Sequence, residues 1–334
     1  MQIGNIKIPE YPLLLAPMED ITDRSFRKIC KSFGADLLYT EFVASEALIR
    51  NIDKTLKKLV IDNDERPAGI QIYGHRIDAM VEAAKIAEEA GPDLIDINYG
   101  CPVKKIATRG AGAGMLRDIP KMIEMTKAIV NAVKLPVTVK TRLGWDNDSI
   151  IIDKIAEQLQ DTGIKALTIH GRTRSQLYKG KADWTLIGKI KQNPNIRIPV
   201  IGNGDITDGI SAKNAFEKYK PDGIMIGRAS IGRPWIFKEI KHYLKTGEIL
   251  PEPDINQKVD IAKQHFKKSI KYKDGNRGIF EMRRHFALYF KGLKNFKETR
   301  LKLLTSTDIN EIYDILDQIK LKYGNSHSTE NAKQ

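Results

Sequence analysis

Eight short apolar runs, separated by segments with helical spacing, constrain the fold of this 334-residue chain more than any other feature. The runs are predominantly apolar, which is typical of parallel strands whose outer face is covered by helices. Eight strand–helix units in about 230 residues predict a (β/α)₈ TIM barrel of the α/β class. A doubly wound sheet is the alternative, but no GxGxxG motif follows the first run. The predicted strands are Leu13–Ala16, Leu37–Tyr39, Ala68–Ile72, Leu94–Ile97, Val137–Lys140, Ala166–Ile169, Ile198–Ile201 and Gly223–Ile226.

The pattern changes after Trp235, where helix-spaced apolar positions continue to Lys322 without a convincing strand. The last of these helices is expected from about Asp308 to Lys322, because Asp308 and Glu311 form a capping signal. Prolines in the segment Gly247–Asp254 indicate a linker. We therefore predict a barrel domain at residues 1–246, a smaller all-α helical-bundle domain at 247–323 and a polar, disordered tail at 324–334.

Composition and charge narrow the function classes. The net charge is +13, and residues 238–300 alone hold 16 basic and 8 acidic side chains. Such a concentrated basic field favours a polyanionic partner, above all a nucleic acid. The alternative is a generally lysine-rich composition, which would give the same charge excess without such a partner. No apolar run approaches the roughly 18 residues that a membrane span needs. The only cysteines are Cys30 and Cys101, without CxxC or HExxH motifs, so we expect a reducing, cytoplasmic location and no metal site.

Polar residues follow nearly every predicted strand, at the end where barrel enzymes collect their chemistry. Because the carboxyl ends of parallel strands meet at one rim, we expect these side chains to form one site. They are Ala16-Pro17-Met18, Gln71, Asn98-Tyr99-Gly100-Cys101-Pro102, Lys140 and Arg142, His170-Gly171-Arg172, Gly202-Asn203-Gly204-Asp205 and Gly227-Arg228.

Three features of this rim indicate chemistry. Glycines after the last two strands let backbone N–H groups approach an anion, so Gly202–Asp205 and Gly227–Arg228 predict a phosphate site, with plain tight turns as the alternative. Lys140 could polarise a flavin ring or form a Schiff base. Cys101, held in a Gly-Cys-Pro turn, could act as nucleophile, general acid or metal ligand.

The glycine-rich segment Gly110–Gly114 is expected to be a mobile loop that closes over the site or meets a phosphate backbone.

Taken together, these motifs resemble the tRNA-dihydrouridine synthases, flavoenzymes that reduce uridine in tRNA, and most of all their bacterial B-type branch. The resemblance spans about Ile8 to the final helix, and Asn98-Tyr99-Gly100-Cys101-Pro102 is its most specific element. Tyr99 departs from the methionine that is more usual there. It lies between the two functional residues and changes neither.

The resemblance implies FMN as cofactor, NADPH as reductant and tRNA as substrate. We also expect a monomeric protein. Cys101 would donate a proton to C5 of uracil while hydride reaches C6. The basic helical domain would grip the tRNA backbone through Lys267, Lys268, Lys271, Arg283 and Arg284. FMN would be bound by Ala16, Pro17, Met18, Gln71, Lys140, His170, Asn203, Gly204, Asp205, Gly227 and Arg228. The flipped uracil would be bound by Asn98, Arg142 and Arg172.

Three other functions remain open from the residues. A flavin barrel acting on a small molecule, of the dihydroorotate dehydrogenase or old yellow enzyme type, would explain Lys140 but not the basic helical domain. A non-enzymatic RNA-binding protein would use the basic field alone. A cysteine hydrolase built on Cys101 and His170 needs an orienting carboxylate that the sequence does not reveal.

Overall fold

All eight predicted runs form strands in the computed structural model, which describes residues 1–324. Every neighbouring pair in the main sheet is parallel, and the order β3-β11-β10-β9-β8-β7-β6-β4 follows the chain around a ring. A parallel bridge between Leu14 and Leu37 joins the two ends. The predicted TIM barrel is therefore confirmed. The strands are β3 (Leu13–Leu15), β4 (Leu38–Tyr39), β5 (Val43–Ala44, a short addition beside β6), β6 (Ala68–Tyr73), β7 (Leu94–Tyr99), β8 (Val137–Arg142), β9 (Ala166–His170), β10 (Val200–Asn203) and β11 (Gly223–Ile226).

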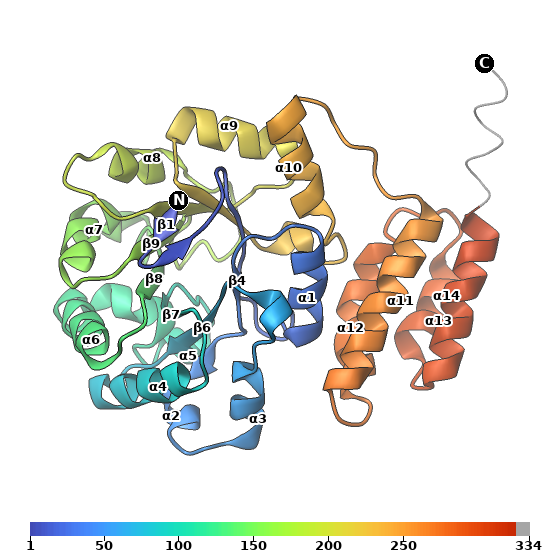
Figure 1. Ribbon diagram of the computed structural model, residues 1–334, viewed down its shortest axis with the longest axis horizontal. Helices are drawn as coiled ribbons and strands as arrows, with labels where there is room; N and C mark the ends of the chain where they lie inside the picture. The colour runs from blue at the N-terminus through green and yellow to red at the C-terminus, as the bar shows by residue number, and fades with distance from the viewer. Residues whose placement is uncertain (325–334) are drawn as a thin grey trace.

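Helices cover the outside of this ring and a separate group lies beside it (Figure 1). The outer elements are α1 (Arg24–Ser32), α2 (Ser45–Leu48), α3 (Asp53–Leu56), α4 (Ile77–Glu89), α5 (Lys104–Ala107), α6 (Ile119–Ala132), α7 (Ile152–Asp161), α8 (Thr185–Gln192), α9 (Gly209–Tyr219) and α10 (Ile236–Thr246). The lateral group, next to α1 and α10 in Figure 1, contains α11 (Ile255–Tyr272), α12 (Arg277–Tyr289), α13 (Lys297–Thr305) and α14 (Ile309–Tyr323). Among helices in the described part of the chain, none has the length and apolar content of a membrane span.

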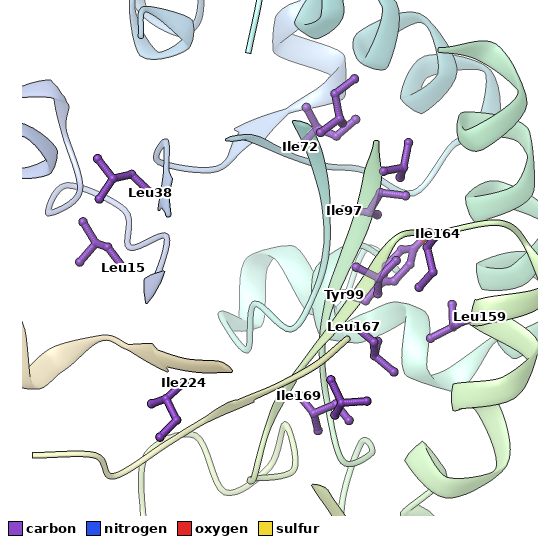
Figure 2. Packing of buried hydrophobic residues seen from close by; sticks show 14 of the residues in the cluster. Leu15, Leu38, Ile72, Ile97, Tyr99, Leu159, Ile164, Leu167, Ile169 and Ile224 are labelled. Atoms are coloured by element: carbon purple, nitrogen blue, oxygen red, sulfur yellow. The ribbon is translucent and has the colours of Figure 1, made fainter. Parts of the chain in front are cut away.

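The strands separate apolar from polar side chains by their two-residue period. In β8, Val137 and Val139 belong to the large cluster between the strands and the outer helices, whereas Lys140 points inward to the cavity described below. Figure 2 shows the outward layer, in which Ile97 and Leu167 face the surrounding helices and Leu159 of α7. The inward positions near the carboxyl ends of the strands are therefore free to be polar.

The opposite end of the barrel is closed by apolar residues. Leu14, Leu94 and Ile201 share a buried cluster with Ile3. Ile3 belongs to an antiparallel hairpin of β1 (Gln2–Ile3) and β2 (Ile6–Lys7) at the start of the chain. This plug leaves the carboxyl ends of the strands as the open end of the barrel.

The four lateral helices have a hydrophobic cluster of their own, which includes Val259, Phe286 and Ile315 and also takes in Trp235 from the barrel side. The last helix begins as the sequence predicts, because the Asp308 side chain accepts a hydrogen bond from the backbone N–H of Glu311 at 2.8 Å. The predicted boundary between residues 246 and 247 falls between α10 and α11. That domain division stays a prediction. Of the predicted disordered tail, residues 325–334 lie outside the described residues.

Phe26 of α1 packs the barrel against the lateral helices. Its ring is completely buried, with centroids 5.4 Å from His265 and 4.5 Å from His285. Burial in a poorly hydrated site lowers the pKa of His285 to about 4 and that of His265 well below its usual value, so both rings are neutral near pH 7. The contact is thus an uncharged aromatic cluster.

We expect Phe26→Ala to lower the free energy of unfolding by about 3–5 kcal/mol, because truncation of a buried aromatic ring leaves a cavity. Chemical denaturation monitored by circular dichroism measures the change. Phe280→Ala is the matched control, since Phe280 on α12 is 48% exposed. Equal losses for the two variants would show that Phe26 has no special part in joining the two clusters.

Candidate active site

A cavity of about 670 Å³ opens at the carboxyl ends of the strands. It collects predicted residues from the carboxyl ends of β7, β8, β9 and β10 and from the loops after β3, β7, β10 and β11, as expected for one shared rim. Thirteen predicted cofactor, substrate or catalytic residues line it: Ala16, Pro17, Met18, Asn98, Cys101, Lys140, Arg142, His170, Asn203, Gly204, Asp205, Gly227 and Arg228.

Gln71 lies below this cavity and not in its lining. It is completely buried and its Nε2 donates to Asp96 Oδ2 at 2.5 Å, while its Oε1 accepts from Asn98 Nδ2 at 2.7 Å. Burial raises the pKa of Asp96 to about 6, although Gln71, Thr138 and Lys140 favour its charged form. Gln71 therefore supports Asn98 from beneath, and its contact with a flavin stays a prediction.

Arg172 also lies behind the cavity wall. Its guanidinium is 2% exposed and donates from Nη2 to Asp205 Oδ2 at 2.7 Å and to the Gly180 carbonyl at 2.6 Å, and from Nε to the Lys179 carbonyl at 3.1 Å. Through Nε and Nη2, Arg172 holds the loop after β9 against the loop after β10, while its Nη1 lies 3.4 Å from Nε2 of the cavity residue His170. Its contact with uracil stays a prediction.

The Cys101 turn is built by the side chain of Asn98. Asn98 Oδ1 accepts from the backbone N–H groups of Gly100 at 2.9 Å and Cys101 at 2.8 Å. Tyr99 points away, with its hydroxyl 3.0 Å from Thr126 Oγ1. Asn98 thus fixes where the thiol lies, in addition to lining the cavity.

The environment of the thiol keeps it protonated. Cys101 is 6% exposed, and burial raises its pKa above the ordinary value of 9.0 despite a backbone hydrogen bond and the nearby Arg142. A protonated thiol suits a general acid better than a nucleophile. His170 does not act as its base here, because its Nε2 faces Arg172 Nη1 at 3.4 Å. Burial and the surrounding cations hold the pKa of His170 well below its usual value.

The glycine-rich segment after this turn is wrongly predicted as a mobile lid. Residues Gly112–Arg117 form a short 3₁₀ helix whose first five residues are buried. Ala113 N donates to the Cys101 carbonyl at 3.1 Å, and a Cβ on Gly112 would lie 3.0 Å from the Cβ of Cys101. The glycines are present because the segment packs tightly behind the Cys101 turn, so it buttresses the site.

Lys140 is the central cation of the cavity. Its ammonium donates to Asn203 Oδ1 at 3.2 Å, and Asn203 Nδ2 donates to the Met225 carbonyl at 2.8 Å. Burial and the nearby Arg142 lower the pKa of Lys140 to about 8. Arg142 is anchored by the carbonyls of Gly100 at 2.7 Å and Thr173 at 2.9 Å, so both cations are fixed before any ligand binds.

The loops after β10 and β11 form the predicted phosphate end. Gly204 has a φ of +126°, a conformation that only glycine adopts readily, and a Cβ there would lie 2.6 Å from the Cβ of Ala182. The Trp184 indole N–H holds the Gly204 carbonyl at 2.9 Å. Arg228, which is more than half exposed, reaches Asp205 Oδ1 at 3.4 Å. The backbone of Gly204 and the Arg228 guanidinium thus line the same end of the cavity.

Tyr178 is a cavity residue that the sequence reasoning missed. Its ring is 53% exposed and lies 4.6 Å from the guanidinium carbon of Arg228 and 5.9 Å from that of Arg142. It stands eight residues beyond the end of β9, so a search of strand ends does not reach it. Its contacts with Arg142 and Arg228 would indicate its place in the cavity, but both arginines belong to other parts of the chain.

The predicted tRNA-backbone residues lie on two neighbouring helices. Lys267 and Lys271 of α11 are exposed and Lys268 is half-buried. On α12, Arg283 lies over Phe280, with 4.7 Å from its guanidinium carbon to the ring centroid. Arg284 reaches Asp20 Oδ2 at 3.3 Å, beside the cavity residue Glu19. The structure thus brings α12 to the cavity mouth, whereas contact with tRNA stays a prediction.

Comparison with known proteins identifies the family. A model described as dihydrouridine synthase matches residues 14–322. The chain belongs to the dihydrouridine synthase family. A probable tRNA-dihydrouridine synthase of Rickettsia bellii is 40% identical over 301 residues, which cover 90% of this chain and 91% of that protein. The tRNA-dihydrouridine synthase B of Pseudomonas putida is 40% identical over 304 residues, 89% of either chain. The resemblance to the B-type branch is confirmed.

Solved structures that resemble this member of the dihydrouridine synthase family confirm its fold alone. Histamine dehydrogenase from Rhizobium sp. 4-9 has a TM-score of 0.57 at 15% identity and covers 97% of this chain and 64% of its own. Morphinone reductase has a TM-score of 0.53 at 13% identity and covers 76% of this chain and 90% of its own.

We expect Cys101 to react more slowly with iodoacetamide at about pH 8 than the same cysteine in urea-unfolded protein, because a raised pKa lowers the thiolate fraction. The rate should rise as the pH passes above the ordinary value of 9.0. Peptide mass spectrometry separates Cys101 from Cys30, which is fully buried and should react more slowly still. Faster alkylation of folded than unfolded Cys101 would indicate a thiolate and remove the general-acid assignment.

Proposed function

We propose that this chain is an FMN-dependent tRNA-dihydrouridine synthase that uses NADPH to reduce the C5=C6 bond of uridine in tRNA. One observation carries the proposal: a protonated thiol, Cys101, lines the same cavity as the buried cation Lys140 and the glycine loops after β10 and β11. Family membership supports the reaction class.

The cavity fits FMN in size and donor chemistry. A volume of about 670 Å³ is in the range of roughly 300–1,000 Å³ that is usual for small-molecule sites. Gly204 and Gly227 would hold the phosphate together with Arg228, since glycine loops at this end of a barrel favour anions. Met18 and Pro17 offer an apolar wall for the ring, and Lys140 would face its polar edge.

When bound, FMN reduced by NADPH supplies the hydride that reaches C6 of uracil. Cys101 then donates the thiol proton to C5, which leaves a C5–H bond and a thiolate that solvent can reprotonate. Arg142 stabilises the negative charge that develops toward the carbonyl side of the base. Asn98 keeps the thiol in register through the two backbone hydrogen bonds of the Cys101 turn.

The substrate must leave its stack to reach this cavity, at a cost of a few kcal/mol. Phosphate contacts from a basic surface offset that cost and make binding sensitive to salt. The exposed lysines of α11 and the arginines of α12 provide such a surface, and Arg284 of α12 reaches Asp20 beside the cavity mouth. The reaction is therefore proposed on tRNA and not on free uridine.

Purified protein, NADPH and unmodified tRNA test the proposal directly. We expect a flavin absorbance band that bleaches with NADPH and recovers with tRNA, together with dihydrouridine in the digested tRNA by mass spectrometry. Equal turnover of free uridine would favour a small-molecule oxidoreductase instead. A colourless protein that binds tRNA would favour a non-enzymatic role.

Cys101→Ala should lower the turnover of tRNA by about 10²–10⁴-fold while FMN content and tRNA affinity stay unchanged, because it removes only the proton donor. Single-turnover oxidation of the reduced enzyme by tRNA measures the loss. Cys30→Ala is the matched control, since Cys30 is buried in α1 away from the cavity lining. A Cys101→Ala enzyme with the original rate would exclude the thiol from the reaction.

Charge reversal of Lys267 and Lys268 to Glu should weaken tRNA binding, and the difference from the unaltered protein should shrink at high salt. Filter binding at several salt concentrations measures both effects. The control is reversal of Lys154 and Lys218, two exposed lysines on the outer barrel helices α7 and α9. If both pairs change affinity equally, binding depends on net charge and not on α11.

A further inference from the structure

The junction between the barrel and the lateral helices contains a buried ion network centred on Lys273. Lys273 follows the last residue of α11, and its side chain is only 10% exposed. Its ammonium contacts Asp23, which precedes α1 of the barrel, and Glu281 on α12. Glu281 also accepts from Arg277 Nε at 2.6 Å. One cation therefore joins residues 250 positions apart in the chain.

Asp23 uses its two carboxylate oxygens for two tasks. Oδ1 accepts from the backbone N–H of Phe26 at 2.7 Å and from Ser25 Oγ at 2.7 Å, and so caps α1. Oδ2 is bound by Lys273. Burial alone would raise the pKa of Asp23, but the Lys273 ammonium holds it well below the usual range, so the pair stays charged.

This network is connected to the cavity through a short turn. Met18, a cavity residue, donates its backbone N–H to Thr22 Oγ1 at 2.8 Å, and Thr22 N donates back to the Met18 carbonyl at 3.0 Å. Asp23 follows this turn directly. Asp20, inside the turn, pairs with Arg284 at 3.3 Å. The same five-residue segment thus bears a wall of the cavity and the contact with α12.

A second ion pair at the junction provides a comparison. Lys57 reaches Asp274, the neighbour of Lys273, at 2.5 Å, but the two side chains are 67% and 89% exposed. Exposed pairs contribute little, because water screens them and their side chains lose entropy. Removal of one partner from a buried pair is costly, because it leaves an uncompensated charge. Both ion pairs thus involve the turn between α11 and α12, one in a buried and one in an exposed environment.

We propose that Lys273 is a positioning residue that fixes the α12 surface relative to the cavity mouth and thereby determines which uridine reaches Cys101. The inference rests on the proposed function. Asp23 and Glu281, the ion-pair partners of Lys273, do not line the cavity, so Lys273 acts through them. Its loss tilts or loosens α12, so a tRNA held by that helix presents its bases to the cavity in the wrong place.

The test compares Lys273→Met, Glu281→Gln and the control Lys57→Met as FMN-loaded full-length proteins. Lys273→Met should raise the KM for tRNA by roughly ten-fold or more, since small misplacements far from the chemistry are costly. Glu281→Gln keeps Asp23 paired and should give a smaller rise. The rate of flavin reduction by NADPH should stay unchanged in all three, and Lys57→Met should match the unaltered protein throughout.

Mass-spectrometric mapping of dihydrouridine in the product tRNA adds a readout that a merely structural role would not move. We expect Lys273→Met to shift or spread the modified positions, while Lys57→Met leaves them unchanged. Unaltered KM and positions in both Lys273→Met and Glu281→Gln overturn the inference, and so does an equal loss of flavin reduction. If Lys273→Met does not fold, Glu281→Gln decides the question. Absence of tRNA reduction by the unaltered protein refutes the proposed function instead.

Discussion

Alternation of side chains along the strands of a closed parallel barrel is the constraint on which the rest of the structure depends. Each strand directs every second residue outward to the helices and the others inward. Because the hairpin around Ile3 plugs one end with apolar residues, the inward polar positions concentrate at the other. Asp96, Asn98 and Lys140 occupy such positions in β7 and β8, next to outward Ile97 and Val139.

The cavity brings together buried polar groups whose desolvation costs free energy. A buried ammonium whose pKa is lowered to about 8 and a histidine kept neutral share a space with a protonated thiol. Residues outside the cavity lining hold these groups in place. Gln71 and Asp96 form a hydrogen-bonded chain with Asn98, and Arg172 joins the loops after β9 and β10. The segment at Gly112 packs against Cys101. Polar groups that are already held in place before the substrate binds can stabilise charge as it develops in the reaction.

Sequence reasoning predicted the barrel and most of its cavity because both depend on local patterns. Strand runs are short and apolar, and the rim residues follow them directly, so Lys140, Cys101 and Arg228 could be placed without coordinates. Tyr178 was not predicted, because it lies in the middle of the loop after β9 and not at a strand end. The direction of Arg172 and the burial of Gly112 depend on contacts with other loops. The Lys273 network joins segments that are far apart in the chain, and the periodicity of apolar residues does not predict such contacts.

A crystal structure of the FMN-loaded protein tests the shared cavity most directly. The proposed arrangement predicts phosphate density against Gly204, Gly227 and Arg228, with the ring beside Met18 and Lys140 and the Cys101 sulfur facing it across the space for a base. Density for FMN outside this cavity, or a Cys101 sulfur directed away from the ring, would contradict it.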